Sequence, residues 1–98
     1  MVDVATTEEF DKWLSRLKDN TGKAKIVARI RRLSLGNPGS VNAVGEGVSE
    51  LKIDFGPGYR IYYKQIGEQA ILILGGGDKD SQAGDIKRAK ALAAELKG

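Results

Sequence analysis

Three cations and one phenol are spaced in this chain so that their side chains could bind phosphate together. Lys52, Arg60, Tyr62 and Lys64 fall within residues 51–64, on the polar side of an alternating pattern. A guanidinium is always charged and can bind two phosphate oxygens at once, which suits Arg60 to stabilising a negatively charged transition state. Charged strand positions are usually a plain solvated face, and this structural interpretation stays open beside the functional one.

A β-hairpin is predicted to position these side chains. Apolar and polar residues alternate over residues 51–55 and again over residues 60–64, which is typical of two half-buried strands. Between them, Pro57 has a fixed φ and Gly58 tolerates a positive φ, which predicts a type II turn. The apolar face of the hairpin can then cover a core, while the cationic side chains lie close together across the strands.

The composition limits the chemistry that is available. The chain of 98 residues has no histidine and no cysteine, which excludes an imidazole base or ligand, a disulfide and a thiolate metal site. A net charge of +3 permits a polyanionic partner such as RNA without requiring one. We expect one domain over residues 1–98, located in the cytoplasm, without a signal peptide, a membrane span, a metal or a cofactor.

Two helices are expected before the hairpin. The first follows a short strand in residues 1–5, and Thr6 caps it in a capping box with Glu9. Its apolar stripe is made by Phe10, Trp13, Leu14 and Leu17, and the pattern breaks at residues 20–22. The second helix is predicted over residues 23–35, with a buried face made by Ile26, Val27, Ile30 and Leu33. Residues 36–47 are expected to form a loop.

A charged stripe on the second helix is another candidate site. Lys25, Arg29 and Arg32 are spaced so that they share one exposed face. A solvated helix face is the plainer interpretation and is slightly preferred, and a ridge that follows RNA phosphates is the alternative.

The end of the chain is expected to complete one sheet and add a last helix. Residues 70–74 are apolar throughout, which indicates a central strand buried on both faces, and Gly75, Gly76 and Gly77 are expected to end it. Asp80 or Ser81 then caps a helix that continues to about Leu96. The predicted fold is therefore α+β, in the order β-α-α-β-β-β-α, with a small, mainly antiparallel sheet packed by helices.

Three segments carry a distinctive sequence. They are Glu9-Phe10-Asp11-Lys12-Trp13-Leu14, residues 51–63 with Gly58-Tyr59-Arg60-Ile61-Tyr62-Tyr63, and residues 74–82 with Gly76-Gly77-Asp78-Lys79. Together they closely resemble the RelE/ParE superfamily of bacterial toxins, and within it the HigB-type "addiction module killer" branch. The similarity extends over nearly the whole chain.

The resemblance implies one half of a type II toxin–antitoxin pair, encoded beside a small antitoxin that often carries a helix-turn-helix domain. RelE-like members cut messenger RNA in the ribosomal A site, whereas ParE-like members poison DNA gyrase, and the fold alone does not choose between these targets. We expect a metal-independent, ribosome-dependent endoribonuclease that inhibits translation. A gyrase inhibitor without catalysis, and a degenerate toxin that acts as antitoxin partner or co-repressor, are the alternatives.

The resemblance also implies roles for single residues. Arg60 matches the arginine that RelE-like nucleases use at the scissile phosphate, and Lys79 lies next to where the family carries another cationic site residue. The expected catalytic residues are Arg60, Lys79, Lys52 and Tyr62, and the expected RNA-binding residues are Lys64, Lys25, Arg29, Arg32 and Asp78. Gly84 stands near the position at which the best-known branch has a tyrosine. We expect Arg60→Ala to change thermal stability little.

Overall fold

The computed structural model describes residues 1–96 and contains five strands and three helices within them. The expected domain end at residue 98 lies outside the described residues. The elements in chain order are β1 (Asp3–Thr6), α1 (Glu8–Arg16), α2 (Asn20–Ser34), β2 (Val41–Gly45), β3 (Val48–Ile53), β4 (Tyr59–Gly67), β5 (Ala70–Gly77) and α3 (Gln82–Glu95). None of the helices in this part of the chain is long and apolar enough to cross a membrane.

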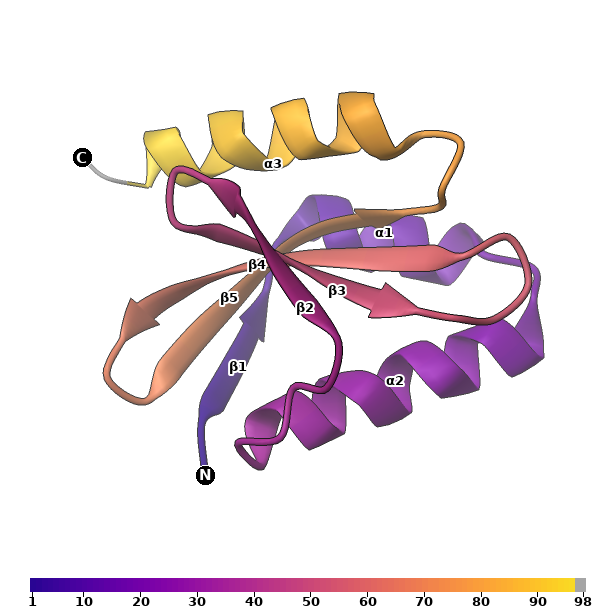
Figure 1. Cartoon of the computed structure of the whole chain (residues 1–98), viewed down its shortest axis with the longest axis horizontal. Coiled ribbons are helices and arrows are strands. Elements are labelled where there is room, and N and C mark those ends of the chain that lie inside the picture. Colours follow the sequence, from indigo (N-terminus) through magenta and orange to yellow (C-terminus); the bar gives the residue numbers. More distant parts are fainter. Residues whose placement is uncertain (97–98) are drawn as a thin grey trace.

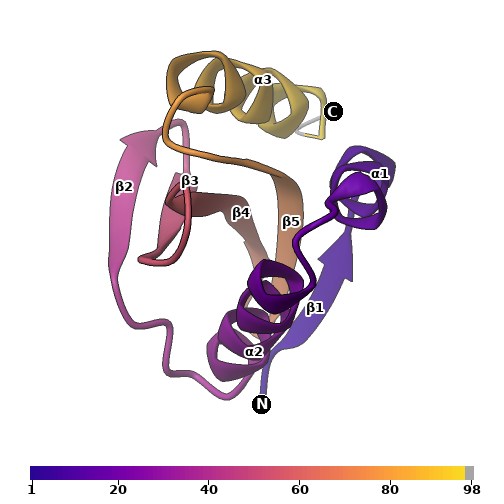
Figure 2. The same ribbon diagram turned by 90° about the vertical axis from the view of Figure 1, so that its right-hand side faces the viewer.

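The strands form one sheet in the order β1-β5-β4-β3-β2. The pairing of β1 with β5 is parallel, and every other pairing is antiparallel. Helix α3 lies over one face of this curved sheet, and α1 and α2 lie over the other (Figures 1 and 2). The α+β fold with a mainly antiparallel sheet is therefore confirmed.

Strand β2 was not expected from the sequence. Its residues lie within the predicted loop, and they pair with β3 from Val41 opposite Leu51 to Gly45 opposite Val48. The pairing covers the backbone donors and acceptors of β3, which would otherwise form the edge of the sheet. The loop prediction for residues 36–47 is therefore wrong at its centre, and the order of elements gains one strand.

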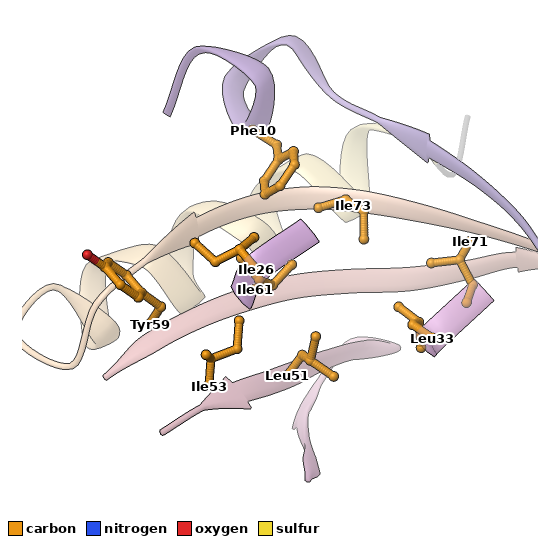
Figure 3. Close-up of a cluster of buried hydrophobic side chains, with 9 residues drawn as sticks. All are labelled: Phe10, Ile26, Leu33, Leu51, Ile53, Tyr59, Ile61, Ile71 and Ile73. Carbon is orange, nitrogen blue, oxygen red and sulfur yellow. The ribbon is translucent and has the colours of Figure 1, made fainter. Parts of the chain in front are cut away.

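The sheet separates two apolar clusters. The cluster under α1 and α2 contains Phe10, Ile26, Leu33, Leu51, Ile53, Tyr59, Ile61, Ile71 and Ile73 (Figure 3). The smaller cluster under α3 contains Val48, Tyr62, Leu74, Ala89 and Ala93. Side chains alternate between the faces of a strand, so each of the central strands contributes to both clusters.

The helix starts differ from the sequence expectation by a few residues. Thr7, and not Thr6, caps α1: its hydroxyl oxygen accepts from the Phe10 N–H at 3.1 Å and donates to the Leu74 carbonyl at 2.8 Å. Thr6 is instead the last residue of β1. In α2, Asp19 is the cap and accepts from the Gly22 N–H at 2.9 Å, so residues 20–22 form the first turn and do not break the pattern.

Three further local predictions are corrected. The Gly58 N–H donates to the Phe55 carbonyl at 3.0 Å and Gly56 has a φ of 57°, so Gly56 occupies the first central turn position that was predicted for Pro57. The glycines at 75–77 do not end β5 but pair with β4. Val27 is 55% exposed and does not belong to the buried face of α2.

Candidate functional site

The expected cationic face of the hairpin exists, and it is the face that α3 covers at one end. Lys52 lies directly opposite Arg60 in the pairing of β3 with β4. Glu50 lies opposite Tyr62 in the same register, and the alternation of side chains places these four residues on one face. The cross-strand neighbourhood of Lys52 and Arg60 is therefore as the sequence predicted, but an acidic residue is part of it.

Arg60 is engaged by a buried carboxylate. Its Nη1 lies 3.4 Å from Oε1 of Glu50, and the two side chains are 13% and 2% exposed. Gln82 of α3 donates from Nε2 to the other oxygen of Glu50 at 2.7 Å. A buried carboxyl group must be paired or hydrogen-bonded, and Arg60 and Gln82 together supply the partners of both Glu50 oxygens. A phosphate that binds Arg60 has to share it with this carboxylate.

The side chain of Tyr62 is on the same face of the sheet as Arg60, and it is fully buried beneath α3. Its burial, and then the charges of Glu50 and Asp85, raise the pKa of its hydroxyl well above the ordinary value. A neutral buried phenol cannot stack on a base from the surface, and it is a poor proton donor at neutral pH. Tyr62, which was expected among the catalytic residues, is therefore placed under α3 and away from the solvent.

Two further cations, which form no ion pair within residues 1–96, lie near the start of β4. Lys52 is partly buried, and its ammonium lies 3.2 Å from the Asn42 amide oxygen when the amide is oriented to accept. Lys79 is exposed in the loop between β5 and α3. Its Cβ lies beside Gly58, two residues before Arg60, at 3.6 Å from where a Cβ on that glycine would be. The start of β4 thus gathers Lys52, Arg60 and Lys79, which we call the cation cluster.

Other predicted residues lie away from the cation cluster or have structural roles. Lys64 is on the same face, but four positions along β4 from Arg60, a distance of about 13 Å in a strand. Its side chain lies against Gly47 in the turn between β2 and β3. Asp78 accepts from the N–H groups of Asp80 and Ser81 at 2.9 and 3.1 Å, so its carboxylate orders the loop before α3.

The charged stripe of α2 lies on the opposite side of the sheet. Arg29 donates from Nη1 to the Lys52 carbonyl at 2.7 Å and from Nη2 to the Pro38 carbonyl at 2.9 Å. Burial, and then the charge of Arg32, lower the pKa of Arg29. Arg29 therefore connects α2 to the sheet through hydrogen bonds, whereas it was expected to bind RNA. Lys25 lies over the Phe55 ring at 4.9 Å, and with Arg32 it borders an open hollow of about 370 Å³.

Sequence reasoning missed Glu50 and Gln82. The signal for Glu50 was present, because it alternates with Lys52 on the polar side of β3. A carboxylate at such a position is ordinarily solvated, and only the packing of α3 over the strand buries it. Within residues 1–96, no group of three or more acidic side chains is arranged to hold a metal ion.

Comparisons with known proteins found one relative by sequence and one similar solved structure. No protein-family model matches the chain. An uncharacterised protein of Haemophilus influenzae is 50% identical over 95 residues, which cover 97% of this chain and 96% of that protein. The solved structure of Escherichia coli toxin RelE, with two arginines changed to alanine and in the free state, superposes with a TM-score of 0.70. That likeness covers 92% of this chain and 94% of the other at 16% identity, and it shows that the fold is RelE-like.

Proposed function

The chain belongs to the family of the uncharacterised Haemophilus influenzae protein and has the fold of RelE, and from this we propose that it is the toxin of a type II toxin–antitoxin module. Its closest branch is the HigB-like one, and its antitoxin carries a helix-turn-helix domain. The toxin acts in the cytoplasm on messenger RNA bound to the ribosome. It cuts the message, so that translation and growth stop, and modules of this kind stabilise the plasmids that carry them.

The cation cluster is the observation that supports nuclease activity. In RNA cleavage the 2′ oxygen attacks the adjacent phosphorus, negative charge accumulates on the phosphate, and the bond to the 5′ oxygen breaks. Arg60 and Lys52 are cross-strand neighbours, and Lys79 is exposed in the loop that lies beside Gly58, two residues before Arg60. Three positive charges at one end of the sheet can bind the phosphate and stabilise the pentavalent transition state.

Glu50 changes how this site would work. Its carboxylate binds the Arg60 guanidinium. This contact restricts the rotamers of the arginine side chain, so that the guanidinium is held in one position for a phosphate. Lys52 is the candidate base of the reaction, because its amine lies directly across the strands from Arg60, where the phosphate would bind. Lys79 is placed to stabilise the departing 5′ oxygen.

The pairing of Arg60 with Glu50 also favours a second candidate function. A toxin that inhibits DNA gyrase by binding needs no base, acid or free arginine, and the burial of Tyr62 removes no group that such a toxin requires. A degenerate toxin that serves as the partner and co-repressor of its antitoxin would tolerate the same arrangement.

The test is a map of RNA 5′ ends, made minutes after the chain is induced in bacterial cells. Lys79→Ala is the informative variant, since Lys79 is exposed and its loss should leave the fold intact. Lys87→Ala, an exposed lysine on α3, is the matched control. New ends inside coding regions, in register with codons and reduced at least tenfold in Lys79→Ala only, would support the nuclease.

Two other outcomes separate the alternatives. Growth arrest with intact messages contradicts the nuclease and directs the search to gyrase cleavage complexes. No growth arrest by the wild-type chain contradicts both active toxins and leaves the degenerate partner.

A further inference from the structure

The positive charge of the chain is concentrated on α2. Of the 16 cations and 13 acids of the chain, α2 holds five cations and no acid, so the other residues together have a net charge of −2. The five cations are Lys23, Lys25, Arg29, Arg31 and Arg32. None of them forms an ion pair within residues 1–96. A surface of this charge attracts an acidic partner.

The outward side of α2 also has exposed apolar side chains. Val27 and Leu35 are 55% and 59% exposed, and Ala24 and Ala28 are exposed beside them. Spacings of three, four and seven residues place these four side chains on one side of the helix, which we call the α2 face. No helix or strand of residues 1–96 lies over it (Figures 1 and 2). The α2 face is therefore an apolar surface without a partner in the described part of the chain.

The hollow next to the α2 face suits one apolar side chain. Its volume is about 370 Å³, and it lies between α2 and the end of β3. Ile53 and Phe55 supply apolar parts of its lining, together with Ala28 of the α2 face. Three cations of α2 also line the hollow, against one acid, Asp54. An apolar side chain with carboxylates on either side would match both parts of this lining.

The small side chains of the α2 face favour a helix as the occupant. Packed helices have their axes about 8–10 Å apart, and the closest approach requires short side chains where they cross. Ala24 and Ala28 are one turn apart and provide such a place. Arg31 lies on one side of these two alanines, and Lys25 and Arg32 lie on the other. An amphipathic helix with acidic residues on both sides of its apolar stripe is therefore complementary to this surface.

Two other occupants fit the α2 face less well. A second copy of the chain would bring five cations against five cations, which repel each other. RNA phosphates would use the cations but not the exposed side chains of Val27 and Leu35. Arg29 already donates to the carbonyls of Lys52 and Pro38, which removes the central cation of the stripe from a phosphate ridge. The apolar and the cationic parts together thus favour an acidic protein segment over RNA.

We propose that the α2 face binds an acidic amphipathic helix of a protein partner, with one apolar side chain of that helix in the hollow beside Phe55. The α2 face lies on the opposite side of the sheet from the face that α3 covers (Figure 2). A helix bound there leaves the cation cluster uncovered. The proposal therefore goes beyond the proposed function and does not depend on it.

A designed peptide provides the test. It has about 20 residues, a length that spans α2, with leucines spaced on one helix face and glutamates on both sides of them. Fluorescence anisotropy of the labelled peptide is recorded while the purified chain is added. We expect saturable binding with a dissociation constant on the order of 10–100 μM that weakens as salt is added. No saturable binding of this peptide would overturn the proposal.

A second peptide separates shape from charge. It has the same composition, but its order is shuffled so that the leucines no longer share a helix face. We expect it to bind at least tenfold more weakly, because its apolar side chains cannot meet the α2 face together. Equal binding of the two peptides would show charge attraction only and would overturn the proposal.

Two variants locate the binding surface, and a third is the matched control. Lys25→Glu should weaken the designed peptide at least fivefold, whereas Lys87→Glu makes the same change of charge at an exposed position of α3 and should leave binding within twofold of the wild type. Ala28→Gln keeps every charge but places a longer side chain at the crossing point, so it should also weaken binding at least fivefold. Wild-type binding by both Lys25→Glu and Ala28→Gln would contradict the proposal.

RNA is tested on the same variants. A labelled RNA oligonucleotide that binds more tightly than the designed peptide, and that is weakened by Lys25→Glu but not by Ala28→Gln, would assign the α2 face to RNA and overturn the proposal. The result is also separate from the test of the proposed function. A chain that cuts messages in cells but does not bind the peptide contradicts the α2 proposal alone. A chain that binds the peptide through the α2 face but leaves messages intact supports the α2 proposal and contradicts the nuclease.

Discussion

Glu50 and Arg60 form an ion pair beneath α3, with Arg60 Nη1 3.4 Å from Glu50 Oε1 and Glu50 only 2% exposed. The pair joins neighbouring strands, and Gln82 connects it to α3. The arginine that is best placed to bind phosphate is therefore also the counterion of a buried acid. Its substitution must affect the fold as well as any catalysis.

Arg60→Ala is expected to destabilise the protein by about 3 kcal/mol, because it leaves the Glu50 carboxylate buried without its counterion. This revises the expectation from sequence that the variant would change stability little. The double variant Glu50→Gln with Arg60→Ala should recover most of the loss, since it removes the buried charge and keeps an acceptor for Gln82. Urea unfolding of the single and double variants measures both values. A double variant as unstable as the single one would contradict the argument.

Arg29 and Arg32 share one helix face but should differ in stability effect. Arg29→Ala removes two hydrogen bonds from a charged group to the Lys52 and Pro38 carbonyls, which should cost about 2 kcal/mol. Arg32→Ala changes an exposed side chain and should stay within about 0.5 kcal/mol of the wild type. Chemical denaturation of both variants compares them. Equal losses of stability in the two variants would contradict a specific contribution of the Arg29 hydrogen bonds to the free energy of unfolding.

Two adjacent glycines of β5 should respond in opposite ways to alanine. A Cβ at Gly76 would lie 2.5 Å from the Trp13 ring, so Gly76→Ala must displace the indole and should cost about 1–3 kcal/mol. Gly75→Ala has open space and should not lower stability. Melting temperatures report the difference, and a shift of the Trp13 emission should accompany Gly76→Ala only. A destabilised Gly75→Ala with an unaltered Gly76→Ala would contradict the packing described.

Phe10 and Ile71 anchor the cluster under α1 and α2, at 2% and 7% exposure. Changing either residue to alanine should destabilise the protein by about 2–5 kcal/mol, with the larger loss at Phe10, because buried apolar area is lost and a cavity is left. Val27→Ala, at a side chain that is 55% exposed, is the matched control and should change stability by less than about 0.5 kcal/mol. Urea midpoints at constant slope measure all three.

Tyr59 should make stability depend on pH in the alkaline range. Burial, and then the hydrogen bond to Asp19 at 2.7 Å, raise the pKa of Tyr59 from its ordinary value of 10.0 to about 12. The folded state therefore holds the phenol proton more tightly than the unfolded chain does. The resulting stabilisation is complete below pH 10 and is lost as the pH rises towards 12.

The Tyr59→Phe variant isolates this effect. It should be less stable than the wild type at neutral pH, because Asp19 loses its donor, and the difference should shrink as the pH rises above about 10. Tyr62 and Tyr63 titrate in both proteins and cancel in the comparison. Unfolding in urea from about pH 8 to about pH 11 gives the two curves. Parallel curves over this range would contradict the assignment.

Much of the fold could be predicted from local patterns. The alternation in residues 51–64 predicted the hairpin, and its register does place Lys52 opposite Arg60. The apolar run at residues 70–74 lies in β5, between two other strands. Strand β2 escaped prediction because its residues are mostly small and half-exposed, and its formation depends on the free edge of β3 and not on its own propensity.

The sequence by itself determined which side chains share a face of the sheet, since alternation in a strand and spacing in a helix are properties of the local chain. Only the tertiary structure decided what covers each face. By packing on the polar side of β3 and β4, α3 buries Tyr62 and Glu50, donates to Glu50 through Gln82 and borders a pocket beside Trp13. The physical reason is that burial and charge pairing depend on contacts between elements that are distant in sequence. The periodicity of residues within one helix or strand does not predict such contacts.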